Sequence, residues 1–498
     1  MDIPSSDRFA ALDPTDWDAF RRFAHAALDD MVDYLANAGD GPAWRPVPER
    51  VKEELRTSLP RTQLPLESVY QDFTSLVLPY PTGNAHPRFF GWVHGGGTPA
   101  GVLAELFAAT MNANVGGREH AAVYVERAVV AWFAELFGFP RDASGIITTG
   151  TSMGNLLAVV AARDAALGAG ARIEGIHGAP LVAYAAIGAH DSIAKALRIA
   201  GLGEDALRPV AVDTTLAMDI AALRVRLADD RAAGARPFLV VATAGSVDAG
   251  AFDHLDELAE LCAREGLWLH VDGAFGAFAI LSPRHAGLVR GIERADSLAF
   301  DAHKWLQVPY TAGCVLFRDE AKHRAAFATA PQYLARAERG TAAGSPWYAD
   351  YGVELSREFR ALKLWFTLRH FGFDRLGEVV AHTCELAARL AAAVTATPEL
   401  ELLAPVALNT VVFRYRRPGL DDPALDRLNE RIAVAVQESG TAVPSTTRIN
   451  GKRALRACII NHRTRAGDID LLVDAVRTAG ATIAASNGLN STETSALS

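Results

Sequence analysis

Residues 297–317 read SLAFDAHKWLQVPYTAGCVLF and place one lysine between two apolar runs. The runs at 297–300 and 314–317 are each typical of a short buried strand, with a proline and a glycine marking the turn between them. Flanked by a histidine and Trp305, Lys304 would lose part of its hydration, which favours the neutral amine that forms a Schiff base. The same residues also fit a lysine whose stem lies over Trp305 while its charge stays in water.

Upstream of this stretch, strand-like apolar runs alternate with amphipathic helical patterns. The expected strands are 181–187, 210–212, 238–242 and 267–271, and the expected helices are 190–200, 216–228 and 253–264. This rhythm predicts an α/β fold with a mostly parallel central sheet and helices on both faces. Ligands of such sheets bind beyond the carboxyl ends of the strands, where His190, Asp272 and Lys304 fall.

The segment GIITTGTSMGN at 145–155 precedes a long apolar-periodic helix. A strand, a Gly/Thr/Ser turn and a helix start can form an anion cradle, because free N–H groups and the positive end of the helix dipole face the turn. It is not a Walker motif, since no G-K-[ST] is present, and many such turns are only helix caps. The segment HPRFFGWVHGGG at 86–97 sets aromatics beside glycines, which fits either a ligand-site wall or a surface loop with an apolar anchor.

An aspartate, a lysine and an anion cradle in this order suit pyridoxal 5′-phosphate (PLP). Lys304 would bind the aldehyde, Asp272 would keep the pyridine nitrogen protonated so that the ring can withdraw electrons, and the turn would hold the phosphate. A histidine such as His190 can lie flat on the ring. Each signal is weak alone, and together they favour a PLP site.

The sequence resembles the group II PLP-dependent amino acid decarboxylases, closest in pattern to the aromatic-L-amino-acid decarboxylase family. The matching segments run through nearly the whole chain: MVDYLA at 31–36, HPRFF at 86–90, GTS at 150–152, AHDS at 189–192, HVDGA at 270–274, DAHKW at 301–305, PQYL at 331–334 and REFRALK at 357–363. The resemblance implies fold type I of the PLP-dependent transferases, with an N-terminal helical arm and a small α+β C-terminal domain.

The resemblance also implies roles for individual residues. Lys304 carries the cofactor, Asp272 pairs with the pyridine nitrogen, His190 stacks on the ring, and Tyr333, on a mobile loop, returns a proton to the substrate carbon. Further cofactor contacts are expected from Thr151, Ser152, the Met153 backbone, Ser246, Ala274, Asp301 and His303. Trp92, Val93 and His94 would form the substrate wall, and no metal ion is expected.

The sequence predicts four parts. These are an N-terminal helical arm for dimerisation (1–97), a large PLP-binding α/β domain (98–361), a small α+β domain (362–485) and a disordered tail (486–498). The resemblance implies a homodimer whose active site lies at the interface. From the residues alone, the first part fits equally a plain helical cap on its own subunit.

Composition limits the partners and the compartment. The 498 residues are 50% hydrophobic and 21% charged, as in a globular protein of two or three domains. The formal net charge of -9 argues against nucleic acid or an anionic membrane as the main partner. The four cysteines form no C-x-x-C pair, and neither a secretory signal nor a membrane span is visible, so a cytoplasmic location is expected.

The expected reaction is decarboxylation of an L-amino acid, with an aromatic substrate leading. An acidic substrate is the alternative, because His94 could pair with a side-chain carboxylate. An aldehyde-forming enzyme, a transaminase and a cofactor-free scaffold of the same fold are the further alternatives. Val247 stands where the family often has threonine, which leaves contacts near the cofactor or substrate open.

Overall fold

The computed structural model describes residues 12–168, 170–328 and 337–486, and a seven-stranded sheet forms its centre. The strands run in the order β1-β7-β6-β5-β4-β2-β3. Their bounds are β1 Ser144–Thr148, β2 Leu181–Ala186, β3 Leu207–Val210, β4 Arg236–Thr243, β5 Trp268–Asp272, β6 Ser297–Asp301 and β7 Gly313–Phe317. All neighbours from β3 to β6 pair in parallel, and β7 runs antiparallel to both β1 and β6. The prediction of a mostly parallel sheet is confirmed.

Helices cover both faces of this sheet, as two adjacent residues of β6 demonstrate. Consecutive side chains in a strand point to opposite faces. Ala299 faces α6 (Thr151–Leu167), where a Cβ on Gly154 would lie 2.9 Å from the Ala299 Cβ. Phe300 faces α5 (Ala121–Leu136), with its ring centroid 4.9 Å from that of Phe133. The other helices of this part are α7 Ala171–Glu174, α8 Ser192–Ile199, α9 Ile220–Ala232, α10 Leu255–Glu265 and α11 Glu320–Phe327.

Side-chain hydrogen bonds move two helix starts from their expected positions. The helix α9 begins at Ile220, four residues later than predicted, because the Asp219 side chain accepts the N–H groups of Ala221 and Ala222. The other helix was expected over 253–264, but Asp253 is buried and accepts the N–H groups of Met218 and Thr243. It therefore ties loops together, and α10 starts at Leu255.

A second, antiparallel sheet forms the small C-terminal domain. Its strand order is β10-β11-β9-β8, with β8 Leu400–Leu402, β9 Thr410–Tyr415, β10 Ser445–Ile449 and β11 Lys452–Cys458. The helices α13 (Asp422–Glu438) and α14 (Ala466–Ala485) pack on it around a separate apolar core. The predicted small α+β domain is confirmed. The sequence pattern had not predicted α14 or the edge strands β8 and β10.

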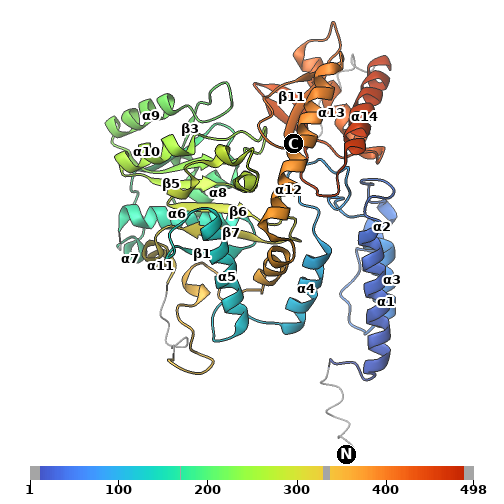
Figure 1. The fold of residues 1–498 in the computed structure, drawn as a ribbon, viewed down its shortest axis with the longest axis horizontal. Coiled ribbons are helices and arrows are strands. Elements are labelled where there is room, and N and C mark those ends of the chain that lie inside the picture. Colours follow the sequence, from blue (N-terminus) through green and yellow to red (C-terminus); the bar gives the residue numbers. More distant parts are fainter. Residues whose placement is uncertain (1–11, 169, 329–336, 487–498) are drawn as a thin grey trace, which may run out of the picture.

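The helix α12 (Ala361–Ala396) joins the two cores and stands between them in Figure 1. The helix contains a non-helical break at Gly372, whose φ is 71°. The apolar side chains before residue 385 join the core of the large domain, and those from Leu386 onward join the core of the small one. By length and composition α12 could cross a membrane, but 39% of its most apolar window is buried inside the protein.

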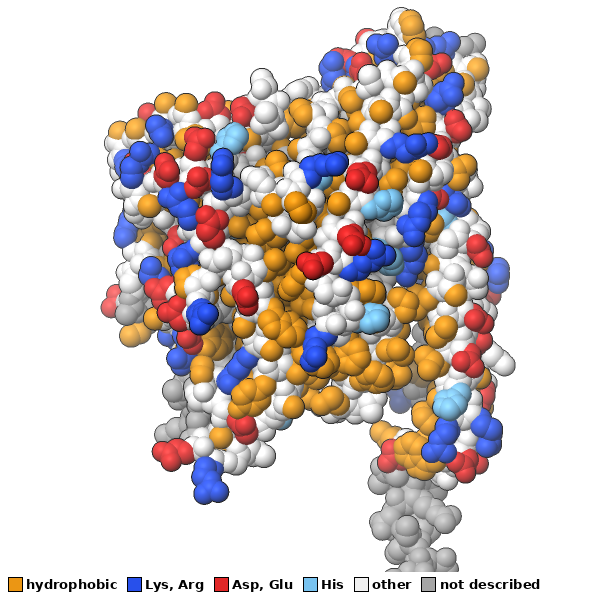
Figure 2. All heavy atoms as spheres, viewed as in Figure 1, with side chains coloured by type: hydrophobic (Ala, Val, Ile, Leu, Met, Phe, Trp, Pro, Cys, Tyr) orange, Lys and Arg blue, Asp and Glu red, His pale blue; other side chains and the backbone are white. Residues whose placement is uncertain are grey.

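The N-terminal helices stand beside this body. They are α1 Trp17–Ala36, α2 Glu49–Glu54 and α3 Leu66–Asp72, at the right edge of Figure 1, and α4 Pro99–Met111 follows them toward the body. The helix α1 buries none of its own residues and meets α3 through the hydrogen bond from Tyr70 to Asp30. Figure 2 shows hydrophobic side chains across the lower part of the face that includes α4. The helical arm is confirmed, while the exact domain boundaries stay predictions, and residues 487–498 of the predicted tail lie outside the described part.

Candidate active site

A cavity of about 480 Å³ lies beyond the carboxyl ends of β5 and β6. It is lined by Trp92, Val93, His94, Thr149, Gly150, Thr151, Ser152, Met153, His190, Thr243, Gly245, Val247, Asp272, Ala274, Phe275, Asp301, His303, Lys304, Tyr310 and Thr311. Lys304 and Asp272 therefore face the same cavity, as the predicted chemistry requires. Of the predicted site residues that the structure describes, only Ser246 is missing from this lining.

Lys304 is held at the end of β6 by a carboxylate. Its Nζ lies 2.9 Å from Asp301 Oδ2, and the other oxygen of Asp301 accepts the Thr151 N–H at 2.7 Å. Asp301 thus ties the lysine to the start of α6. His303, beside it, accepts the Ala312 N–H on Nδ1, and burial lowers the pKa of this imidazole to about 4. His303 is therefore neutral at neutral pH.

The turn before α6 has the properties of a phosphate cradle. Gly150 and Gly313 allow strand and turn to meet closely, since a Cβ on Gly313 would lie 2.6 Å from the Gly150 Cα. The Thr151 side chain is buried, and its Oγ1 has no hydrogen-bond partner among the described residues. A buried hydroxyl without a partner costs free energy unless a ligand supplies one. The residues present at this helix start therefore fit the phosphate of PLP.

Asp272 ends β5 as a buried carboxylate with fixed orientation. Its Oδ2 accepts the Asn155 Nδ2–H at 2.9 Å, and its Oδ1 accepts the Ala274 N–H at 3.2 Å. His190 lies at the exposed rim of the cavity, where its Nδ1 contacts the Ser192 hydroxyl at 2.8 Å. The Asp272 carboxylate can accept a hydrogen bond from a protonated ring nitrogen, and the His190 imidazole can lie against a planar ring.

Aromatic rings form the outer wall of the cavity. His94 stacks on Phe89 and on Trp92, with ring centroids 5.8 and 5.9 Å apart, and its edge faces Tyr310. Trp92 is about half exposed and has φ of 49°, so its backbone adopts the left-handed region. Burial, and then the charge of Lys304, lower the pKa of His94. The wall is therefore aromatic and uncharged at neutral pH.

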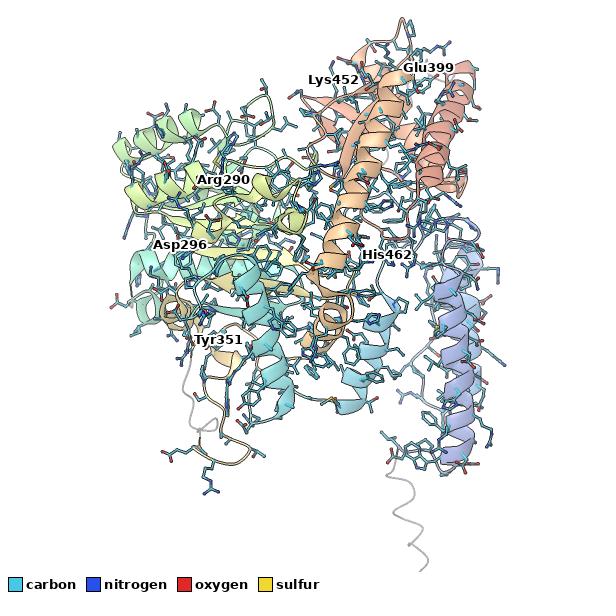
Figure 3. All side chains as sticks on the ribbon, viewed as in Figure 1. Arg290, Asp296, Tyr351, Glu399, Lys452 and His462 are labelled. Atoms are coloured by element: carbon cyan, nitrogen blue, oxygen red, sulfur yellow. The ribbon has the colours of Figure 1, made fainter. Side chains whose placement is uncertain are left out.

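The small domain supports the lysine loop through Gln307. The amide of Gln307 donates to the Ile460 carbonyl at 2.7 Å, and its Oε1 accepts the Gly96 N–H at 2.9 Å. His462, labelled in Figure 3 beside α12, lies with its Nδ1 3.1 Å from the same Oε1. Glycine is required at position 95, because a Cβ there would lie 2.3 Å from the Lys304 carbonyl oxygen. Segments far apart in the chain thus fix the backbone that carries Lys304.

The structure places one predicted site residue, Ser246, elsewhere. Ser246 lies outside this cavity, because its hydroxyl is directed into its own turn and accepts the Ala251 N–H. Its neighbours Gly245 and Val247 line the cavity instead. Tyr333 lies outside the described residues, and its role stays a prediction.

Several contributors were not predicted from the sequence. Asn155, Gln307 and Tyr310 act through tertiary contacts with segments remote in the chain. For Asn155 a signal existed, because it lies four residues after Thr151 and therefore on the same face of α6. Arg456 is also buried, and it donates from Nη1 to the Trp92 carbonyl behind the aromatic wall.

Comparisons with known proteins identify the family of this chain. The pyridoxal-dependent decarboxylase conserved domain matches residues 48–416. The chain is 32% identical to an aromatic-L-amino-acid decarboxylase of Bacillus atrophaeus over 450 residues, covering 89% of this chain and 92% of that protein. An aromatic-L-amino-acid decarboxylase of Sus scrofa is 30% identical over 475 residues, covering 90% of this chain and 94% of that protein.

Solved structures show the same architecture. The crystal structure of Oryza sativa TDC with PLP and tryptamine has a TM-score of 0.87 at 27% identity, covering 95% of this chain and 100% of that chain. The crystal structure of mouse CSAD has a TM-score of 0.87 at 26% identity, covering 93% and 99%. Predicted fold type I is thereby confirmed. With a lysine, an aspartate and a phosphate cradle in one cavity, the chain belongs to the pyridoxal-dependent decarboxylase family and is a PLP-dependent amino acid decarboxylase.

Proposed function

We propose that this decarboxylase acts on an aromatic L-amino acid and releases the corresponding amine. The observation that carries the proposal is the aromatic wall of the cavity, where Trp92, His94 and Tyr310 meet. A planar substrate ring stacked there gains about 1 kcal/mol beyond its buried area. Relatives named for tryptophan, tyrosine and aromatic amino acids support this choice.

An acidic substrate is disfavoured by the charge state of His94. To pair with a substrate carboxylate, His94 would have to be protonated, and both burial and Lys304 lower its pKa. A neutral imidazole beside Trp92 suits an uncharged ring better. We therefore propose that glutamate and aspartate are poor substrates.

PLP supplies the electron sink for this chemistry when it is bound. We propose that Lys304 would bind its aldehyde through the side-chain amine. Asp272 would accept a hydrogen bond from the protonated ring nitrogen, and His190 would lie against the ring. Thr151, Ser152 and the backbone at Met153 would hold the phosphate.

Asp301 serves the cofactor site indirectly. A carboxylate cannot donate to a phosphate, but Asp301 fixes both the Thr151 N–H and the Lys304 ammonium. His303 is neutral and packs against Tyr310 with ring centroids 4.2 Å apart and ring planes tilted by 37°. We propose that these residues exclude water around the departing carboxylate, and that Tyr333 then returns a proton to the substrate carbon.

A product screen tests this function. Purified holoenzyme is incubated with each of the twenty amino acids and dihydroxyphenylalanine, and amines, aldehydes and keto acids are quantified by mass spectrometry. We expect amines from aromatic substrates, with none from glutamate. Lys304→Ala should lower the rate to below about one thousandth, while Lys195→Ala, on an exposed position of α8, keeps it. Keto acid as the main product would indicate a transaminase, and amine from glutamate alone would reject the aromatic substrate.

We also propose a homodimer that works in the cytoplasm without a membrane or nucleic-acid partner. Support comes from the large apolar side chains that α1 and α4 expose, which are Trp17, Phe20, Leu28, Val32, Leu103, Leu106, Phe107 and Met111. Sedimentation should give twice the chain mass of 53.2 kDa. Trp17→Asp with Phe20→Asp should shift the protein toward monomer, whereas Val225→Asp, on exposed α9, should not. A monomeric wild type would reject the dimer.

A further inference from the structure

A continuous chain of buried hydrogen bonds runs from the interior of the sheet to Asp272. Trp268 Nε1 lies 2.8 Å from Ser297 Oγ, which lies 2.9 Å from His270 Nδ1. His270 Nε2 lies 2.8 Å from Asn155 Oδ1. The side chains of Ser297, His270 and Asn155 are completely buried. Neither His270 nor Asn155 lines the cavity, so they act on the site only through their partners.

The direction of this chain is fixed at both ends. Asp272 as a carboxylate only accepts, so Asn155 must direct its NH₂ group toward it and its carbonyl oxygen toward His270. His270 must then donate from Nε2. Burial lowers the pKa of His270 to about 4, so the ring is neutral and its Nδ1 accepts from the Ser297 hydroxyl. Trp268 is a pure donor and satisfies the remaining lone pair of that hydroxyl.

A branch of the chain reaches His190. Asn155 Nδ2 also donates to the Ser192 hydroxyl, with 3.0 Å between nitrogen and oxygen. That hydroxyl lies 2.8 Å from His190 Nδ1. The Ser192 N–H also donates to Nδ1, so this nitrogen accepts. In a neutral His190 the proton is therefore on Nε2. One amide thus orients both groups that meet the cofactor ring.

We propose that Asn155 and His270 are positioning residues for the reaction, which keep the Asp272 carboxylate aimed at the ring nitrogen. The proposal rests on the role of Asp272 in the proposed function. If His270 cannot donate, the Asn155 oxygen loses its buried donor, and the orientation of the amide toward Asp272 is no longer fixed from that side. Hydrogen bonds to charged groups are among the stronger ones in proteins, and buried groups gain most from them.

The test measures the protonation of the ring nitrogen directly. Holoenzyme loaded with PLP labelled with nitrogen-15 in the ring is titrated with pH, and the ring-nitrogen chemical shift is followed. His270→Phe and Asn155→Leu should lower the pKa of this nitrogen by about one unit. The value of kcat should fall about tenfold with KM changed less than about twofold. His270→Gln, which restores an N–H toward Asn155, should recover most of both.

Matched variants separate positioning from loss of stability. His323 is equally buried but hydrogen-bonds to Ser144 and the Tyr351 carbonyl and to no member of this chain, so His323→Phe should lower the melting temperature and leave the nitrogen titration unchanged. Ser297→Ala removes only the hydroxyl that contacts His270 Nδ1. This variant tests the inference if His270→Phe does not fold. It should shift the titration in the same direction by a smaller amount.

Two results would overturn the inference. One is a titration identical to wild type in both His270→Phe and Ser297→Ala, and the other is an equal shift in His323→Phe. If the wild-type ring nitrogen is itself unprotonated at neutral pH, the assigned role of Asp272 fails instead. A protonated wild type with unchanged variants rejects only the hydrogen-bond chain.

Discussion

Thr151 illustrates how a single residue can be poised for a ligand. Its backbone N–H is held by Asp301, while its buried hydroxyl has no partner among the described residues. Such an arrangement has a cost in the apoprotein and gives binding free energy only when an acceptor arrives. The Thr151 hydroxyl therefore contributes to the affinity for the cofactor and not to the stability of the fold.

Thr151→Val should therefore separate binding from stability. We expect the dissociation constant of PLP to rise about tenfold, because one hydrogen bond to a charged group is lost. The apoprotein should melt within about 2 °C of wild type or slightly higher, since the unpaired hydroxyl is gone. Equilibrium dialysis and calorimetry check the two values. Weaker folding with unchanged cofactor affinity would contradict the assignment.

Tyr333 is the residue predicted to return the proton to the substrate carbon, and its replacement tests that role. In the resembling family, phenylalanine at this position goes with oxidative aldehyde formation, and relatives named phenylacetaldehyde synthase are 29% identical to this chain. For Tyr333→Phe we expect less amine, with aldehyde and hydrogen peroxide in its place. Product analysis by mass with a peroxide assay tests this. An unchanged amine yield would show that the proton comes from another group.

At the scale of elements, the glycine run and the lysine loop form one packed unit. Gly95 lies against the backbone of His303 and Lys304, and Gln307 links the same loop to Gly96 and to the small domain. The position of Lys304 therefore depends on three segments that are remote in the chain. This is the physical reason why a short motif alone does not make the site.

Gly95→Ala should disable the enzyme without unfolding the sheet. An added Cβ would lie 2.3 and 2.4 Å from the carbonyl oxygens of Lys304 and His303, so the loop must move. We expect kcat/KM to fall by at least about 100-fold, since displacements near 1 Å have that effect. Gly287→Ala, where the added atom meets nothing within 4 Å, is the control. Equal activity of both variants would show that the loop tolerates the shift.

At the scale of the whole molecule, buried histidines make stability depend on pH. Burial lowers the pKa of His270 and His303 to about 4 and of His323 and His462 to about 3. The unfolded value is 6.5, so the unfolded chain binds more protons between these limits. Their stabilising contribution is complete above pH 6.5 and is lost as the pH falls toward 4 or 3.

The free energy of unfolding should therefore fall on acidification. Each such histidine lowers the free energy of unfolding by about 1.4 kcal/mol per pH unit between its unfolded and its folded pKa. Denaturant unfolding of the apoprotein at pH 7, 6 and 5 measures how steeply the free energy of unfolding changes with pH. His323→Phe should reduce this slope by the contribution of one histidine. A free energy of unfolding that stays constant from pH 7 to pH 5 would refute this account.

Sequence patterns were enough to predict the sheet, the cofactor and most of the cavity. Apolar runs such as 297–300 are typical of strands buried on both faces of a sheet, and strand ends of such a sheet meet at one edge. Lys304, Asp272 and the turn at 150–155 could therefore be placed together from their order alone. The short edge strands and the helix starts were predicted less well, because tertiary hydrogen bonds such as those of Asp253 set them.

Folding sets which polar groups serve the site and how they point. Ser246 was expected to contact the cofactor, yet its hydroxyl accepts the Ala251 N–H of its own turn, whereas Asn155, which was not predicted, donates to Asp272. The protonation of His94 and His270 is likewise set by burial. Hydrogen-bond direction and desolvation depend on neighbours brought together by folding, and the order of residues along the chain does not contain them.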